Sequence, residues 1–397
     1  MNSRPTPMAV TGFSLRTPLG DDVETITRRM LAGERAIAPN SRFSAQTYSC
    51  QLAASITAEP KATKYRKFVK RMGLFGMEVG AEAFAKSGSP ARGPRLGLFC
   101  GYGGLRAHWD DLMPVLENQD GSLTADGSWT NGFSLLHPFW MLFHLSNNAH
   151  ALLSIQLGCT GDGTTTAGSN AGAQALRAAI AALEVGSIDT AIVFAYDSLV
   201  EPETILSLGT SGAATQASEA TAVGAPYGET AAGFVPSEAA AALVLEKPEH
   251  ATGRTLALLS ASTTADGNAG FAAPSTMAQA LAVVARNDKL VDGAGVGQRD
   301  RDAAERLLVA NILGSGVPLM STTANLGQMG AATPLVQTLL LMHFLSQKTV
   351  PAIAGLSSPT PGPLRPLVKS EATDARSAVA LSCGMPGLVG AVRVELP

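Results

Sequence analysis

The chain has 397 residues, of which 46% are hydrophobic and 15% are charged, and its formal net charge is −3. These values are typical of a large, well-buried globular protein with two domains or one duplicated unit. The weak negative charge and the low aromatic content of 5% argue against nucleic acid as a partner.

Neither the cysteines nor the apolar segments indicate a metal site or a membrane span. The longest apolar runs, such as residues 239–245, are far shorter than the ~20 residues that cross a bilayer. Residues 1–7 lack the apolar segment of a signal peptide, which predicts a cytoplasmic protein. The cysteines form no CxxC pair and have no histidine at metal spacing, so we expect free thiols, no metal and no cofactor: Cys50, Cys100, Cys159 and Cys383.

In chain order, the first quarter alternates short strands with helices. Residues 8–13 (MAVTGF) predict a buried strand, and a helix with acidic residues at its start follows over residues 21–32. Apolar residues at helical spacing predict a helix within residues 61–86, whose first half is basic. Residues 96–100 (LGLFC) predict another buried strand, which leads into a glycine-rich turn at 101–104.

A strand, a helix and a second strand then follow one another closely. Residues 164–167 predict a β-branched strand, and Ser169 or Asn170 can cap the helix predicted over residues 171–185. A glycine directly after that helix ends it, and residues 189–196 predict the next strand. This spacing predicts a right-handed parallel crossover.

The remainder of the chain repeats the alternation of strands and helices. Because the two parts have a similar order of elements and no linker between them, we expect an α/β fold in two halves, residues 1–250 and 251–397. Residues 233–246 predict a loop followed by a buried strand. The later predicted strands are 256–263, 319–322, 377–382 and 387–396, and the later predicted helices lie near 277–286, 301–313 and 334–346.

Five stretches resemble, in the same order, the motifs of β-ketoacyl-acyl-carrier-protein synthases. Each stretch is weak alone, but together they span essentially the whole chain. The resemblance implies the thiolase fold, a duplicated α/β architecture with the layers α-β-α-β-α. The stretches are 10–12 (VTG) with 17–20 (TPLG), 101–105 (GYGGL), 161–189, 233–246 with 250–251, and 321–332.

Members of this family join acyl chains by decarboxylative condensation. A cysteine at a helix N-terminus takes the acyl group, two histidines stabilise the carbanion, and a lysine supports the site. By the family's spacing, the cysteine position falls on Ser169, or on Gly168 when the preceding strand is matched instead. The first histidine, the lysine and the second histidine fall on Ala294, Thr323 and Gln328. The resemblance therefore implies that no catalytic set is intact.

The histidine count supports the same interpretation without any alignment. The only histidines after residue 150 are His250 and His343, and neither opens a Gly/Thr turn. Ser169 would need a base to act as a nucleophile, and a helix terminus supplies only ~0.3–1 kcal/mol. We therefore interpret Ser169 as a helix N-cap. An active acyltransferase or malonyl decarboxylase that uses Ser169 is the alternative.

The turn that forms the family's C-terminal gate also differs. Family members usually have F-G-F-G-G there, and a backbone N–H of this turn contributes to the oxyanion hole. This chain has Cys383-Gly384-Met385-Pro386-Gly387. Because Pro386 fixes φ and has no N–H, we do not expect a swinging gate, although Met385 can still donate its own N–H.

Loss of the whole catalytic set resembles the chain-length factor, or KS-β subunit, of type II polyketide and aryl-polyene systems. The resemblance implies a heterodimer with an active ketosynthase, working on chains that an acyl carrier protein holds on phosphopantetheine. A homodimeric structural pseudoenzyme is a further alternative. The compact length favours an aryl-polyene-type system over aromatic polyketides.

In such subunits, the helix after the GxGGL turn helps to shape the far end of the partner's acyl tunnel. On this chain that helix carries His108, Trp109, Leu112 and Leu116. Trp109 is either a stop for a growing chain or an ordinary interface residue. Phe139 and Phe143 are either core or interface residues or line the tunnel.

A basic segment precedes and begins the helix predicted within residues 61–86. It can meet an acidic acyl carrier protein or form an ordinary solvated helix face. The residues concerned are Lys64, Lys67, Lys70 and Arg71.

Overall fold

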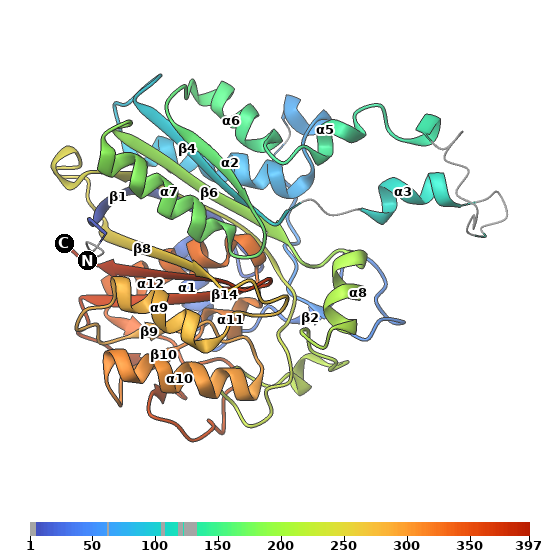
Figure 1. Cartoon of the computed structure of the whole chain (residues 1–397). Coiled ribbons are helices and arrows are strands. Elements are labelled where there is room, and N and C mark those ends of the chain that lie inside the picture. The colour runs from blue at the N-terminus through green and yellow to red at the C-terminus, as the bar shows by residue number, and fades with distance from the viewer. Residues whose placement is uncertain (1–4, 62, 105–107, 118–121, 123–132) are drawn as a thin grey trace.

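The computed structural model describes residues 5–61, 63–104, 108–117, 122 and 133–397. Ten of its strands form two sets of five, and the two sets have the same topology (Figure 1). In chain order the first set is β1 (Met8–Arg16), β4 (Leu96–Tyr102), β5 (Gly163–Ala167), β6 (Thr190–Ser198) and β7 (Glu238–Glu246). The second set is β8 (Ala257–Ala265), β9 (Val291–Asp292), β10 (Pro318–Met320), β14 (Ser377–Gly384) and β15 (Leu388–Glu395).

Both sets place their strands in the same spatial order, β1-β7-β6-β4-β5 and β8-β15-β14-β9-β10. In each, the last strand along the chain is antiparallel to its two neighbours, and the other pairings are parallel. β1 pairs with β8, so the sets join into one sheet, which β12 (Arg365–Pro366) extends to 11 strands. This repeat confirms the duplicated α/β fold. The division at residues 250 and 251 stays a prediction.

Helices form three layers around the two sets (Figure 1). α7 (Ala171–Val185) and α12 (Thr333–Gln347) pack between the sets. The outer face of the first set is covered by α2 (Arg71–Ser87) and α6 (Asn148–Leu157), and that of the second by α9 (Pro274–Val284) and α10 (Arg299–Leu313). The resulting order α-β-α-β-α is the thiolase-like architecture that the family resemblance implies.

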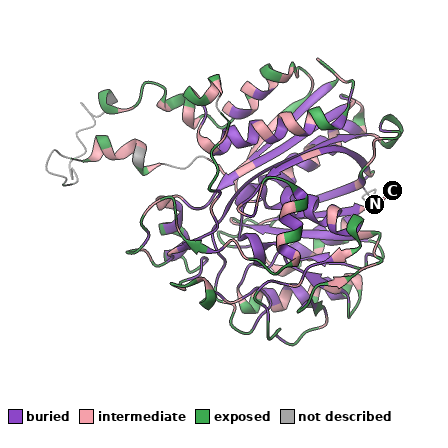
Figure 2. Ribbon diagram, turned by 180° about the vertical axis from the view of Figure 1, so that it is seen from behind, coloured by how far each residue is buried: buried purple, intermediate pink, exposed green. Residues whose placement is uncertain are grey.

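Successive side chains of β7 point to opposite faces of the sheet, so one strand packs against helices on both faces. Ala239, Ala241, Leu243 and Leu245 belong to the central hydrophobic cluster, whereas the residues between them belong to the outer cluster below α2. This period of two is that of a pleated strand with both faces covered. α12 is buried on nearly every side, as expected for a helix that is apolar all round. Figure 2 shows this burial along the sheet and the central helices.

Two short helices project from the body, α3 (Trp109–Leu116) and α5 (Trp140–His144) (Figures 1 and 2). We call residues 108–117 and 133–145 the arm. The remaining helices are α1 (Val23–Leu31), α8 (Pro202–Thr210), α11 (Thr322–Leu326), η1 (Lys64–Lys67), η2 (Phe133–Leu135), η3 (Ala220–Ala222), η4 (Pro248–His250) and η5 (Gly330–Ala332). The remaining strands are β2 (Ala38–Pro39), β3 (Leu52–Ala53), β11 (Thr349–Val350) and β13 (Glu371–Ala372).

Most predicted elements agree with the structure to within a few residues, and α7 has the predicted bounds. The helix predicted within residues 61–86 is wrong in its first half, because η1 ends at Lys67 and α2 begins only at Arg71. Lys70 has extended backbone angles there, so the chain turns between the two helices. No helix among the described residues is both long and apolar enough to span a membrane.

Candidate functional site

Ser169 lies at the junction between β5 and the central helix α7. Gly168 and Asn170 on either side have positive φ angles of 115° and 73°. Asn170, not Ser169, holds the N-cap position, and no side chain caps the helix, so the expected capping role of Ser169 is wrong. The gate turn packs directly on this junction, since a Cβ built on Gly384 would lie 2.7 Å from Ser169 Cβ.

The other three residues that we predict at the family's catalytic positions meet in the second half of the fold. Ala294 follows β9 and Thr323 follows β10, and the carboxyl ends of neighbouring parallel strands lie at one edge of a sheet. The Thr323 hydroxyl donates to the Gly295 carbonyl oxygen at 3.0 Å, and the Gln328 amide donates to the Ala294 carbonyl oxygen at 3.4 Å. The Thr333 hydroxyl donates to the amide oxygen Oε1 of Gln328 at 3.5 Å.

A buried phenol and carboxylate lie beneath this turn. Glu305 accepts hydrogen bonds from the backbone N–H of Ala294 at 2.8 Å and from the Tyr227 hydroxyl at 2.9 Å. The Tyr227 oxygen also accepts from the Gly295 N–H at 2.9 Å. Tyr227 was not identified from the sequence, because it lies in a segment without periodicity and its partner is 78 residues away.

The gate turn connects β14 to β15 and is bonded to a neighbouring loop. The Gly387 N–H donates to the Gly270 carbonyl oxygen at 2.8 Å, and the Asp266 N–H donates to the Gly387 carbonyl oxygen at 3.2 Å. Burial raises the pKa of the Cys383 thiol to about 12. Met385 and Pro386 are joined by a cis peptide bond. The turn is thus held to the 266–273 loop by backbone bonds on both sides of Gly387.

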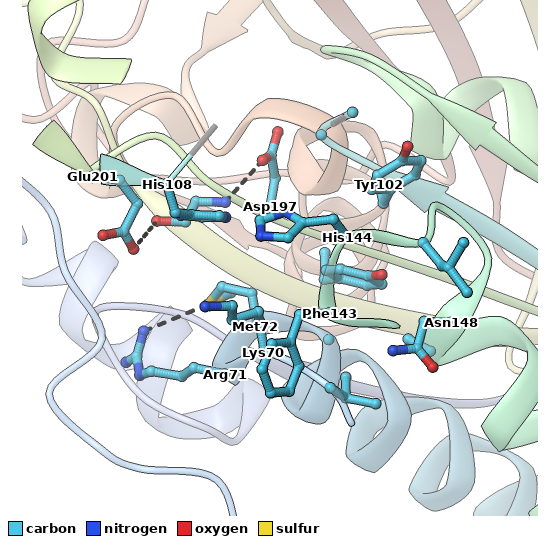
Figure 3. A pocket seen from close by; sticks show the side chains of 18 of the residues that line it. Lys70, Arg71, Met72, Tyr102, His108, Phe143, His144, Asn148, Asp197 and Glu201 are labelled. Atoms are coloured by element: carbon cyan, nitrogen blue, oxygen red, sulfur yellow. Dashed lines mark hydrogen bonds between the residues drawn. The ribbon is translucent and has the colours of Figure 1, made fainter. Parts of the chain in front are cut away.

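A cavity of about 260 Å³ lies where the parallel strands β4 and β6 end, below the arm (Figure 3). Of the predicted tunnel residues, His108 and Phe143 line it, together with Lys70 and Arg71 from the start of α2. The other predicted tunnel residues are not among the described residues that line this cavity: Trp109, Leu112, Leu116 and Phe139. Trp109 and Phe139 are instead 37% and 40% exposed on the arm.

Residues 6–251 match the family model of the β-ketoacyl synthase N-terminal domain. This match covers more than half of the chain. The chain belongs to the β-ketoacyl synthase family.

Curated relatives of this β-ketoacyl synthase family member span nearly its whole length. It is 25% identical to the tetracenomycin polyketide synthase ketoacyl synthase beta subunit of Streptomyces glaucescens, with 99% of each chain covered. It is 23% identical to 3-oxoacyl-[acyl-carrier-protein] synthase 2 of Coxiella burnetii, with 92% of each covered. The resemblance to a ketoacyl synthase beta subunit and to a 3-oxoacyl synthase thus extends over both halves of the fold.

Solved structures share the fold. A β-ketoacyl synthase from Burkholderia phymatum superposes with a TM-score of 0.86 at 18% identity, covering 98% of this chain and 99% of that one. The ishigamide ketosynthase/chain length factor superposes with a TM-score of 0.83 at 17% identity, with full coverage of both chains. These likenesses confirm the thiolase-like fold.

The basic residues predicted for carrier-protein docking divide into two pairs. Lys64 and Lys67 are exposed on η1. Lys70 donates to both carboxylate oxygens of Asp111 at 2.7 Å, and Arg71 pairs with the fully buried Glu238 at 2.9 Å. The second pair is therefore engaged with carboxylates, although the Lys70 side chain is still 39% exposed, and the docking role of all four residues stays a prediction.

The buried acid pair Asp302 and Glu305 makes stability depend on pH. Burial, and then the neighbouring Glu305, raise the pKa of Asp302 to about 8. A carboxyl whose folded pKa lies above its unfolded value stabilises the fold at low pH, and this contribution is lost as the pH rises towards 8. We expect the free energy of unfolding to fall between pH 5 and pH 8 by up to about 1.4 kcal/mol per pH unit for this one proton.

Asp302→Asn should lower this slope by the share of one proton, about 1.4 kcal/mol per pH unit, in urea unfolding measured between pH 5 and pH 8. Glu305 and Asp292, whose pKa values burial raises to about 7, keep their own share. Asp300→Asn is the matched control, because Asp300 lies on the same helix turn but is exposed, and this variant should keep the wild-type slope. An unchanged slope in Asp302→Asn would contradict the raised pKa of Asp302.

Proposed function

We propose that this chain is a non-catalytic subunit, like a chain-length factor, that pairs with an active β-ketoacyl synthase and shapes its acyl tunnel. The observation that carries the proposal is the state of the four catalytic positions. Thr323 and Gln328 have their polar groups bonded to the Ala294–Gly295 turn or to Thr333, and none of the four side chains is a general base. Lost acid–base groups cost ~10²–10⁴-fold in rate, which a serine at a helix end does not replace.

The pairing surface that we propose centres on β5. Among the described residues this strand lies at the edge of the sheet, pairs with β4 alone and is partly exposed. Such an edge pairs readily with another chain. α6 flanks it, with a 2.9 Å hydrogen bond between His150 and Thr165. Exposed large apolar side chains gather on α6 and the arm: Trp109, Leu135, Phe139, Met141, Leu142, Leu145 and Ile155. Clusters of this kind mark protein interfaces.

The partner is, in this proposal, an active ketosynthase that receives its chains from an acyl carrier protein in the cytoplasm. Two relatives support the choice. One is named as a polyketide synthase beta subunit. The other, solved as AntDE:AntF, is described as a type II polyketide acyl-carrier protein in complex with its ketosynthase. We favour an aryl-polyene-type product because the chain is compact.

Ile155→Glu should weaken pairing about 100-fold, because a carboxylate would be buried in the apolar interface without a partner. Ile155 is 71% exposed in the chain alone, so the substitution should leave the fold unchanged. Analytical ultracentrifugation with the co-expressed ketosynthase measures the effect. Leu307→Glu is the matched control on the outer helix α10, where the side chain is 55% exposed, and it should pair normally. Equal pairing of both variants would contradict the proposed surface.

Phe143→Ala should lengthen the products of the reconstituted pair, because Phe143 fills part of the cavity wall. Removing its ring enlarges the cavity on that side. Mass spectrometry of the released chains gives the product distribution. Trp109→Ala tests the earlier tunnel assignment in parallel, since Trp109 does not line the cavity. If Trp109→Ala alone gave longer products, the end of the tunnel would lie at the exposed face of α3 and not at Phe143.

A further inference from the structure

Both described parts of the arm contribute to the wall of the cavity (Figure 3). His108 comes from the part that carries α3, whereas Phe143 and His144 come from the part that carries α5. The body supplies other parts of the wall, among them Lys70 and Tyr102. The arm therefore covers one side of the cavity, and its position sets how far the cavity is closed.

Neither arm helix can hold this position by itself. α3 has 8 residues and contains Pro114, and α5 has 5 residues. Isolated helices shorter than about 12–15 residues are marginal in water, so contacts with the body must seat the arm. The Phe139 ring meets the Phe68 ring edge-on. His108 Nδ1 lies 3.3 Å from Glu203 Oε1 on α8.

One carboxylate joins both arm helices to the body. Asp111 of α3 accepts hydrogen bonds on its two oxygens from Lys70, at the start of α2, at 2.7 Å. Its Oδ2 also lies 3.1 Å from Nε2 of His144 on α5. We call these three residues the junction. Although burial opposes ionisation, the hydrogen bonds from Lys70 and His144 lower the pKa of Asp111, so the carboxylate is ionised near neutral pH.

The junction lies near the surface, so salt should weaken it. The side chain of Asp111 is 17% exposed and that of Lys70 is 39% exposed. Salt screens charges that solvent reaches, because the Debye length falls from about 10 Å at 0.1 M ionic strength to about 3 Å at 1 M. An apolar contact, such as that between Phe139 and Phe68, is not screened in this way.

We propose that the arm is a strap that closes the cavity, that the junction holds it shut, and that the shut arm presents the pairing surface. The last part rests on the proposed function. It follows from the exposed apolar side chains on the arm: Trp109, Leu135, Phe139, Met141, Leu142 and Leu145. If only the shut arm presents them correctly, the affinity for the partner falls with the fraction of chains whose arm is shut.

The first experiment follows hydrogen exchange of the purified full chain by mass spectrometry. In Asp111→Asn, which removes the charge but keeps the shape of the side chain, residues 108–117 and 133–145 should exchange about 10-fold faster, and α7 at the wild-type rate. Raising NaCl from about 0.05 M to about 1 M should speed exchange in the wild-type arm but not in that of Asp111→Asn. A role of Asp111 in packing alone would not give this difference in salt response.

The second experiment measures pairing with the co-expressed ketosynthase by analytical ultracentrifugation. Lys70→Met and Asp111→Asn should each weaken pairing about 10-fold, because fewer chains hold the arm shut. Lys61→Met is the matched control. Its ammonium also bonds a carboxylate, that of Glu82 at 2.9 Å, but neither residue belongs to the arm. Pairing and arm exchange in Lys61→Met should therefore equal those of the wild type.

Wild-type exchange in the arm of Asp111→Asn would overturn the proposal. Faster exchange in α7 as well as in the arm would also overturn it, because Asp111 would then hold the whole fold. Faster exchange in the arm with unchanged pairing would break the link between the strap and the pairing surface. A wild-type chain that pairs with no ketosynthase would instead contradict the proposed function, and the exchange of the chain alone would still decide whether the junction holds the arm shut.

Discussion

Cysteine introduced at position 169 is expected to leave the chain without condensing activity. The position lies at the start of α7, where the helix terminus favours a thiolate, so Ser169→Cys restores the nucleophile itself. It does not restore the groups that stabilise the carbanion, because our prediction places Ala294 and Gln328 at the histidine positions and Thr323 at the lysine position. Each missing group costs ~10²–10⁴-fold, so turnover should stay at the background rate.

Release of carbon dioxide from malonyl-acyl-carrier-protein and formation of the condensed product measure this outcome. Ser169→Ala is the control that defines the background, and iodoacetamide labelling shows that the new thiol is accessible. The native thiols should not interfere, since burial raises the pKa of each of them. A rate for Ser169→Cys more than 100-fold above that of Ser169→Ala would contradict a silent site.

Arg393→Met should cost about 3–5 kcal/mol of unfolding free energy, because it leaves a buried carboxylate without its cation. The Arg393 guanidinium lies 2.9 Å from Asp288, whose side chain is fully buried. Asp288 also accepts hydrogen bonds from the Ser377 hydroxyl at 2.6 Å and the Arg286 N–H at 2.8 Å. The pair ties β15 and β14 to the segment before β9.

Equilibrium unfolding in urea measures the change. The double variant Arg393→Met/Asp288→Asn should recover part of the loss, since the uncompensated charge is gone. Arg29→Met is the matched control, because its pair with Glu34 is exposed and such pairs contribute ~0–1 kcal/mol. A loss below 1 kcal/mol in Arg393→Met would show that the buried pair does not hold the strands together.

Much of the fold could be predicted because the local signals are strong. α7 follows a β-branched strand and ends at Gly186, whose positive φ of 76° suits glycine, so both of its ends are marked in the sequence. The break before α2 could not be predicted. The apolar period continues through Phe68, but Thr63 caps η1 and the chain turns at Lys70.

The sequence predicted only those residues of the site that lie in linear motifs. Spacing placed Ala294, Thr323 and Gln328 in one region, and the structure brings them together through the carbonyls of one turn. His144 was not predicted as a residue of the site. Its position in the cavity wall depends on a hydrogen bond with Asp111, 33 residues earlier, and on the packing of the arm over β4 and β6. Contacts between distant segments leave no periodic signal in the sequence.

Turnover of the reconstituted pair with Ser169→Ala in this chain tests most directly whether the chain is a silent partner. The partner ketosynthase is co-purified with either wild-type or variant chain, and condensation is followed with malonyl-acyl-carrier-protein. We predict unchanged turnover with Ser169→Ala and none when the partner's own nucleophile is replaced. A fall of 10-fold or more with Ser169→Ala, in a pair that still assembles, would contradict the proposed function.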